Sequence, residues 1–421
     1  MIFISMLMIL LALLGTPLFA VIAASALLGF YSIEVDISAV ILEINRIVDA
    51  PVLVSIPLFT FAGYLMGESG TPQRLVALSR ALFGWMPGGL AIVTLIVCAM
   101  FTAFTGASGV TIVALGSLLY PALKQDGYKE NFNLGLLTTS GSLGLLLPPA
   151  VPLILYGIVS KTSVDKLFLA GLLPGFLMIV FLSMYSMSKG IIGKIPRTPL
   201  RFNKVVRALR NAIWEIPLPI IVLGGIYSGY FAVSEAAAVT AFYALIVEVV
   251  VYRDISFKQL PSIMRNSMVL VGAILIILGV SLASTNYLID SEVPMKLFAF
   301  IKAHVSSRVT FLLMLNIFLL ILGCMLDIFS AIMLVVPLIL PLAVSYGIDP
   351  IHLGIIFLAN MQIGYCTPPV GMNLFIASYR FKKPVVQLYA ATLPFLFLLL
   401  ITVLIITYCP ELSMWLVHLS E

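Results

Sequence analysis

Residues 144–149, GLLLPP, and residues 364–369, GYCTPP, stand at an offset of 220 and decide the fold. Proline and glycine interrupt helical hydrogen bonding, and matched interruptions inside apolar segments are typical of duplicated transporters whose substrate site lies at discontinuous helices. The same offset relates further prolines and glycines, namely Pro121 and Pro341, Gly127 and Gly347, and Pro174 and Pro394. The chain is therefore predicted to contain two related copies of one membrane-embedded unit.

The composition of the chain excludes a water-soluble domain. Of its 421 residues, 62% are hydrophobic and only 10% are charged, whereas soluble proteins carry about a quarter charged residues. Met1 to Phe30 contains no charged residue and lacks the basic start of a signal peptide, so we expect it to remain as the first span. The four cysteines show no paired spacing, which favours buried thiols. The net charge of +5 is spread over short loops and does not indicate a nucleic-acid partner.

Long apolar segments predict the membrane topology, because backbone groups in lipid must bond within a helix and about 20 residues cross the hydrocarbon. Crossings are expected near residues 3–30, 51–69, 131–160, 167–188, 212–230, 233–252, 267–289, 351–380 and 385–408. Two further apolar segments, 89–122 and 309–344, are interrupted halfway, at residues 105–109 and 326–330. Each half has about 12 to 17 residues, which is short for a crossing. We predict two re-entrant helical hairpins; a pair of short complete spans at each place is the alternative.

The distribution of positive charge favours the hairpins. With them, 17 of the 23 lysines and arginines fall on one side, which the positive-inside rule assigns to the cytoplasm, together with the N-terminus. The loop at residues 290–308 fits less well, and its apolar spacing predicts an amphipathic helix at the membrane surface. The segment from Lys189 to Arg210 carries seven positive charges and predicts either a helix lying on the anionic cytoplasmic leaflet or a solvated loop.

The number of crossings predicts that the two copies have opposite orientations. Five crossings precede the partner of the first span, and an odd number turns the second copy upside down. The predicted fold is an all-α polytopic membrane protein with an inverted repeat, two opposed re-entrant hairpins and two discontinuous helices, which is the plan of alternating-access carriers. Its predicted parts are the first repeat at 1–188, a basic cytoplasmic connector and linker helix at 189–230, and the second repeat at 231–421.

The chemistry is expected where the two hairpin tips meet the two helix breaks. Unwound backbone there offers carbonyl oxygens to a hard cation, and the N-termini of the half-helices favour a carboxylate. Glycine allows close approach, and hydroxyl groups can add oxygen ligands. The candidate substrate contacts are Ser108, Ser142, Pro149 and Asn373.

Asp327 is the most informative single residue, because a carboxylate inside an apolar segment is costly and indicates a functional site. It could coordinate a cation, carry a proton or cap the following helix, and the sequence leaves these alternatives open. Glu235 is expected to cap the helix that follows it. No HExxH motif, paired intramembrane aspartates or serine with a histidine or lysine in the core occurs, so an enzyme is not predicted.

At these residues the sequence resembles the large membrane subunit, of the DctM type, of tripartite ATP-independent periplasmic (TRAP) transporters. The resemblance covers essentially the whole chain. It is most specific at residues 106–109 (GASG), 147–149 (LPP), 234–238 (SEAAA) and 367–373 (TPPVGMN).

The resemblance implies a secondary carrier that imports an organic acid, such as sialic acid, a C4-dicarboxylate or another sugar or keto acid, with Na+ as the coupling ion. It implies a transport domain that moves as an elevator, a four-helix small subunit of the DctQ type and a periplasmic binding protein of the DctP type in the bacterial inner membrane system. The small subunit is expected to be a separate polypeptide. The Na+ sites that it implies fall at Gly106, Ser108, Ser140, Gly144, Asp327, Gly364 and Thr367.

Two other functions remain possible from the sequence. One is a stand-alone dicarboxylate or anion exchanger on the same inverted-hairpin plan, and the other is a membrane-embedded enzyme or assembly scaffold. Uptake by the polypeptide without partners would favour the exchanger.

Overall fold

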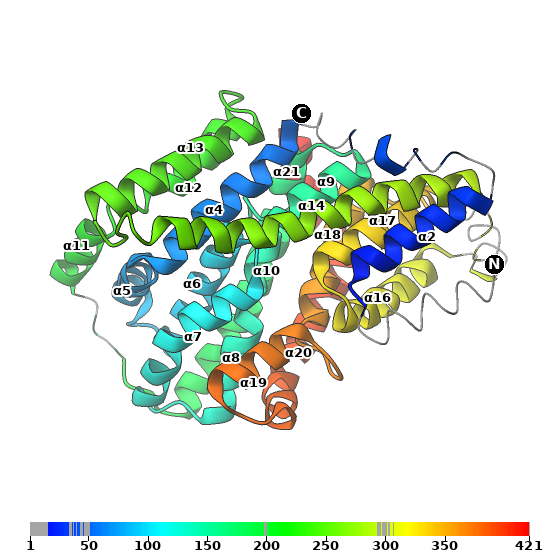
Figure 1. Ribbon diagram of the computed structural model, residues 1–421. Coiled ribbons are helices and arrows are strands. Elements are labelled where there is room, and N and C mark those ends of the chain that lie inside the picture. The colour runs from blue at the N-terminus through cyan, green and yellow to red at the C-terminus, as the bar shows by residue number, and fades with distance from the viewer. Residues whose placement is uncertain are drawn as a thin grey trace.

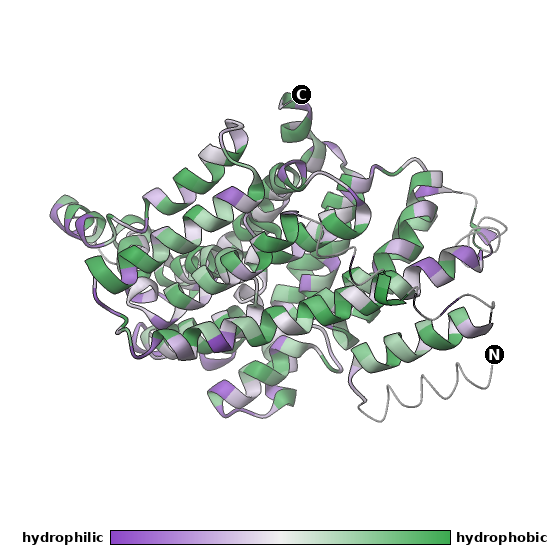
Figure 2. Cartoon of the chain, turned by 45° about the horizontal axis from the view of Figure 1, so that its top comes forward, coloured by the Kyte–Doolittle hydropathy of each residue, from purple (hydrophilic) through white to green (hydrophobic). Residues whose placement is uncertain are grey.

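The computed structural model describes residues 16–32, 36, 38, 40–42, 45, 51–197, 199, 201–292, 296, 301, 304, 305 and 307–420. Within these residues the secondary structure is helical, without a strand (Figure 1). Seven of the described helices are long and apolar enough to cross a bilayer, and a pair bent by 44° at residues 147–150 makes up to eight. Hydrophobic residues run along the long helices, and hydrophilic residues lie mostly near helix ends and in loops (Figure 2). The protein is therefore a multi-pass membrane protein.

The first copy consists of two entry helices, a hairpin, a broken helix and a long closing helix. Its elements are α2 (Leu18–Ser32), η1 (Pro51–Val54), α4 (Ser55–Glu68), α5 (Thr71–Phe83), α6 (Gly89–Thr105), α7 (Ser108–Gln125), α8 (Glu130–Ser140), η2 (Leu143–Leu146), α9 (Val151–Ser160) and α10 (Val164–Ile192). Helices α6 and α7 form the first hairpin, and α8, η2 and α9 form the broken helix. The described part of the first predicted crossing is α2; residues 3–15 lie outside the described part.

A connector and a second copy follow. The connector contains α11 (Phe202–Asn211) and α12 (Pro217–Tyr227), and the second copy contains α13 (Val233–Leu245), η3 (Ile246–Val251), α14 (Leu260–Asp290), α16 (Arg308–Met325), α17 (Ile328–Ser345), α18 (Pro350–Gly364), α19 (Met372–Phe381), α20 (Val385–Tyr408) and α21 (Glu411–Leu419). Helix α17 begins and ends 220 residues after α7, and the arms before them, α6 and α16, end at the same offset. The local structure therefore repeats in register with the sequence.

The two copies exchange contacts symmetrically. Helix α2 packs on α14 and α13 packs on α4, so each copy places one entry helix against the other copy (Figure 1). In the same way α7 packs on α19 and α17 packs on α9, which joins each hairpin to the far half of the other copy's broken helix. Helices α6 and α16 pack instead on the near half of the broken helix of their own copy. This reciprocal pattern is expected for two copies related by a twofold axis, as in an inverted repeat.

The hairpin arms are at or above the upper end of the predicted 12 to 17 residues. Helix α6 has 17 residues and α7, α16 and α17 have 18 each, because the helices run directly up to the two-residue turns at Gly106–Ala107 and Leu326–Asp327. Length alone therefore does not separate a re-entrant arm from a short crossing. The position of the tips does, because the first tip lies beside the break after α8 and the second beside the break after α18. Both tips thus end partway along helices that continue beyond them.

The linker helix is shorter than the predicted crossing at 212–230. Helix α12 contains 11 residues, or about 16 Å at the rise of an α-helix. It starts at Pro217, which lacks an amide donor, and it ends before Gly229, whose φ of 75° breaks the helical path. The residues from Ala212 to Ile216 form turns that lead from α11 into α12.

Other local predictions can be compared with the structure directly. Glu235 accepts a hydrogen bond from the Ala232 amide at 2.9 Å, which confirms that it caps α13. Three of the cysteines are buried, but Cys409 is exposed because it follows the last turn of α20. Helix α11 exposes Phe202 and Val206, as an amphipathic surface helix does. Most of the amphipathic helix predicted at 290–308, including Met295 and Phe298, lies outside the described residues.

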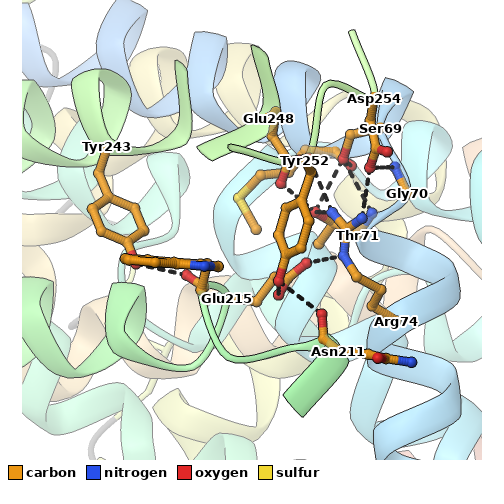
Figure 3. A network of polar contacts seen from close by, with 12 residues as sticks. Ser69, Gly70, Thr71, Arg74, Asn211, Glu215, Tyr243, Glu248, Tyr252 and Asp254 are labelled. Atoms are coloured by element: carbon orange, nitrogen blue, oxygen red, sulfur yellow. Dashed lines mark hydrogen bonds and ion pairs between the residues drawn. The ribbon is translucent and has the colours of Figure 1, made fainter. Parts of the chain in front are cut away.

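A network of charges around Arg74 links α5 to the connector, to η3 and to the turn that follows η3 (Figure 3). The Arg74 guanidinium contacts Glu215, lies 3.0 Å from Glu248 Oε2 and 2.6 Å from Asp254 Oδ2, and stacks 3.8 Å from the centre of the Tyr252 ring. Burial and the Glu215 carboxylate raise the pKa of Tyr252 to about 12, so this hydroxyl remains a donor to Glu215. Removing one partner of such a buried group leaves the others uncompensated. The network therefore fixes the helix that leads into the first hairpin.

Candidate substrate and ion site between the hairpin tips

The first tip is a tight turn whose helix begins with a serine. Gly106 adopts a left-handed φ of 64° and its amide bonds to the Thr102 carbonyl, which ends α6. Ala107 is extended, and α7 then begins at Ser108. The Ser108 hydroxyl lies 2.7 Å from Asn373 Oδ1 of the second copy, and both side chains are buried. The first tip is therefore tied to the helix that follows the opposite break.

The second tip is capped by a carboxylate. Asp327 Oδ2 accepts a hydrogen bond from the Ser330 amide at 3.0 Å, which makes Asp327 the N-cap of α17. The Ile328 amide donates to the Tyr365 hydroxyl at 2.6 Å. Tyr365 stands in the break directly after α18, so this tip is tied to the break of its own copy.

Glycine brings each hairpin into backbone contact with a broken helix. A Cβ added to Gly144 would lie 2.1 Å from the Ala99 carbonyl oxygen, and one added to Gly364 would lie 2.5 Å from the Gly323 carbonyl carbon. Contacts this short exclude any side chain at either position. Between the breaks, the Ser142 hydroxyl donates to the Gln362 carbonyl at 3.1 Å, and these two residues are themselves 220 apart. The two copies therefore meet at equivalent residues.

A cavity of about 390 Å³ lies between the two tips and the entry helices. Its polar lining comes from Ser108, Asp327, Tyr365 and Tyr64, and the tip backbone at 106–110 faces it as well. The opposite wall is apolar and belongs to α14, through Leu270, Ala273, Ile274 and Ile277.

A second cleft of about 830 Å³ shares lining residues with this cavity and extends it. The shared residues are Tyr64, Gly109, Val110 and Ile376, and the far end is lined by Glu68 and Gln73 at the junction of α4 and α5. The site between the tips is therefore connected to the end of the molecule that holds the Arg74 network.

Three of the predicted site residues, Gly106, Ser108 and Asp327, lie together in the cavity. Asn373 is completely buried behind Ser108, where its amide also donates to the Thr138 carbonyl at 3.3 Å. The Ser142 hydroxyl donates to the Gln362 carbonyl, across the interface between the two copies. Pro149 lies elsewhere, in an apolar cavity of about 180 Å³ with α6 and α12.

The hydroxyls of the remaining serine and threonine candidates donate to carbonyls of α8 and α18. The Ser140 hydroxyl donates to the Leu137 carbonyl at 3.4 Å and the Thr367 hydroxyl to the Ile363 carbonyl at 2.9 Å. Gly144 and Gly364 serve as contact points for the hairpins. Among the described residues no three His, Cys, Asp or Glu side chains cluster as metal ligands. A cation site here would draw on Asp327 together with carbonyl and hydroxyl oxygens.

Sequence reasoning missed three features of this site. Tyr365 was part of a quoted break, but its role as acceptor for the Ile328 amide follows only from the fold. The apolar wall from α14 carries no local signal, because Ala273 and Ile274 look like ordinary residues of an apolar span. Thr102 was also missed, although its hydroxyl bonds to both Thr111, at 2.6 Å, and the Gly141 carbonyl, at 2.9 Å.

Two opposed hairpins and two broken helices around a shared cavity define the inverted-repeat fold of a class of membrane transporters. In fold the chain is similar to the YdaH transporter of Alcanivorax borkumensis, with a TM-score of 0.63, 14% sequence identity, and coverage of 90% of this chain and 87% of that one. It is also similar to MtrF of Neisseria gonorrhoeae, with a TM-score of 0.52, 13% identity, and coverage of 87% and 81%.

The family is settled by sequence. Residues 4–412 match the family described as "Tripartite ATP-independent periplasmic transporter, DctM component", and the chain belongs to that family. It is 36% identical to the C4-dicarboxylate TRAP transporter large permease protein DctM of Pseudomonas aeruginosa, over 86% of this chain and 85% of the relative. It is 34% identical to the isethionate TRAP transporter permease protein DctMQ of Oleidesulfovibrio alaskensis, over 87% of this chain and 58% of the relative. It is 32% identical to the ectoine/5-hydroxyectoine large permease protein UehC of Ruegeria pomeroyi, over 98% and 97%.

Proposed function

We propose that this large permease couples the import of an organic acid to a Na+ gradient. The observation that carries the proposal is the cavity between the tips, which combines one carboxylate, Asp327, with the N-terminus of α7. The carboxylate and the nearby carbonyl oxygens suit a hard cation. The free amides and the positive dipole end of α7 suit an anion. Cation and substrate would thus bind side by side between the hairpins.

The proposed substrate is a small organic acid that arrives with a binding protein. The relatives are named for C4-dicarboxylates, isethionate and ectoine, which all carry a carboxylate or sulfonate group. A carboxylate or sulfonate group could accept hydrogen bonds from the amides at the N-terminus of α7. The remainder of these substrates differs from one relative to the next. C4-dicarboxylates are the first class to test, with sialic acid and other sugar or keto acids as further members.

The proposed mechanism is an elevator. The two hairpins and both broken helices form one tightly packed unit, and α2, α4, α13 and α14 form the other through exchanged contacts. The cavity lies between these units, with polar tips on one wall and the apolar face of α14 on the other. A sliding unit would carry the polar wall past the apolar one, and the cleft toward Glu68 would be the cytoplasmic exit.

The proposed assembly contains a small membrane subunit of the DctQ type and a periplasmic binding protein of the DctP type in the bacterial inner membrane. Family membership supports it, as does the relative that is named DctMQ. We also propose, from the positive-inside rule, that the N-terminus and the Arg74 network face the cytoplasm.

Reconstitution tests this proposal. Proteoliposomes containing the chain and its small subunit would receive binding protein loaded with labelled succinate, under an inward gradient of Na+ or of K+. We expect uptake only with Na+ and with all three components. Uptake by the chain alone would identify a stand-alone exchanger. Equal uptake with K+ would overturn the coupling.

A further inference from the structure

A groove of about 380 Å³ lies on the outside of the hairpin unit, away from the tip cavity. It is formed by the loop between α7 and α8, the first turn of α8, the end of α10 and the first half of α20. Helix α20 packs on both α8 and α10 (Figure 1). Its floor is aromatic. The rings of Phe132, Tyr185 and Phe395 form a triangle with centroid separations of 5.2 to 6.1 Å.

Two lysines stand at the rim of this groove, Lys129 and Lys189, and both are exposed. The Lys189 ammonium lies 5.2 Å from the centre of the Tyr185 ring. Within the described part of the chain neither lysine forms an ion pair. The carboxylates beside Lys129 in the sequence are engaged elsewhere, Asp126 with Arg80 at 3.2 Å and Glu130 with Lys383. The rim therefore presents positive charge that the protein does not neutralise.

The surroundings of the groove are apolar and face outward. Met184, Ile191 and Ile192 on α10 are between 57% and 76% exposed, and Leu393 and Phe397 on α20 are 61% and 64% exposed. Such side chains on membrane-spanning helices contact lipid chains. Lys189 stands in the last turn of α10 and Lys129 is the N-cap residue of α8, both on the side with the excess of positive charge. Their depth is therefore that of the headgroups of the cytoplasmic leaflet.

We propose that this groove binds an anionic phospholipid of the cytoplasmic leaflet. The headgroup phosphate lies between Lys129 and Lys189, and an acyl chain runs over Phe132 and Phe395 along α20. Basic pockets between membrane helices on the cytoplasmic face recognise anionic headgroups in this way. A free phosphate would use only the two lysines and leave the aromatic floor uncovered, so the combination of charge and apolar floor selects a lipid.

The experiment measures lipid binding to the detergent-purified chain by native mass spectrometry. Phosphatidylglycerol is compared with phosphatidylcholine of the same acyl chains, and inorganic phosphate is added in a third arm. Each basic residue near an anionic surface contributes roughly a factor of five in affinity, so K129Q/K189Q is expected to bind phosphatidylglycerol about 25-fold more weakly. K129R/K189R should keep the binding. The matched control K124Q/K258Q removes two exposed cytoplasmic lysines outside the groove and should bind as the unmodified chain does.

A steric variant tests the floor without changing charge. Ala390 is exposed and lines the groove, so Ala390→Trp should fill it and displace the lipid while both lysines remain. Equal binding of the two lipids, unchanged binding by K129Q/K189Q or by Ala390→Trp, an equal loss in K124Q/K258Q, or competition by inorganic phosphate would each overturn the proposal.

Discussion

At the first tip α7 begins after Ala107, whereas at the second tip α17 begins after Asp327, although the two residues are 220 apart and occupy the same cap position. The first tip is fixed by Ser108, which bonds to Asn373 of the other copy. The second is fixed by Tyr365 from the break of its own copy. The first tip thus has no side-chain cap and no charge, whereas at the second tip the Asp327 carboxylate caps α17.

This difference teaches that duplication conserved the backbone while the chemistry of the tips diverged. Two identical tips would present either two carboxylates or two uncapped helix N-termini to the cavity. An asymmetric pair offers one position suited to a cation and one suited to an anion. The symmetric features are those of packing, such as Gly144 and Gly364, and the asymmetric ones are those that face the cavity.

The largest expected effect comes from breaking a symmetric contact. Gly144→Ala would push a Cβ to 2.1 Å from a backbone carbonyl oxygen of α6, and we expect it to destabilise the protein by about 3 kcal/mol or more. Gly364→Ala meets the α16 backbone at 2.5 Å and should cost less, in the range of about 1 to 3 kcal/mol. Thermal unfolding in detergent measures both. Gly272→Ala on α14 is the control, because nothing lies within 4 Å of its added Cβ, and it should be neutral or slightly stabilising. A neutral Gly144→Ala would contradict the contact between the hairpin and the break.

The next largest effect is expected at Asp327, where two substitutions distinguish its role as the N-cap of α17 from its role as a negative charge in the cavity. Asparagine caps helices as well as aspartate does, so Asp327→Asn should keep the stability of α17, whereas Asp327→Ala should lose about 1 kcal/mol. Both variants remove the negative charge. At an effective dielectric constant of about 20, a carboxylate beside a cation contributes several kcal/mol, so both should raise the Na+ concentration for half-maximal uptake by about tenfold or more.

Uptake into proteoliposomes at varied Na+ and thermal unfolding of the same preparations give the two readouts. If Asp327→Asn keeps its Na+ dependence, Asp327 serves only as a cap and the proposed asymmetry of charge between the tips fails.

The sequence predicted the parts of this structure that depend on local backbone chemistry. Glycine and proline at matched positions located both breaks, and the carboxylate at Asp327 marked the second tip. It does not determine which face of an unwound segment points into the cavity, and so the roles predicted for Ser142 and Thr367, whose hydroxyls donate to carbonyls in the structure, stay predictions. The three carboxylates around Arg74 were also not foreseen, since they come from segments more than 140 residues further along the chain. Pairings over such distances depend on the packing of helices and leave no periodic signal.

The smallest expected effect on the cavity itself concerns the hydroxyl that fixes the second tip. Tyr365→Phe leaves the buried Ile328 amide without its acceptor, and an unsatisfied buried donor costs about 1 to 3 kcal/mol. The ring remains, so the lining of the cavity changes by one oxygen atom. Thermal unfolding should show this loss, while Tyr379→Phe, which removes a hydroxyl from a residue that is 88% exposed, should show none. Ser108 bonds to the Asn373 side chain, and Tyr365→Phe keeps the Tyr365 carbonyl that accepts from the Asn373 amide, so combining Tyr365→Phe with Ser108→Ala should give additive losses. Strong coupling between the two changes would show that the tips, despite their different partners, are held by one shared network.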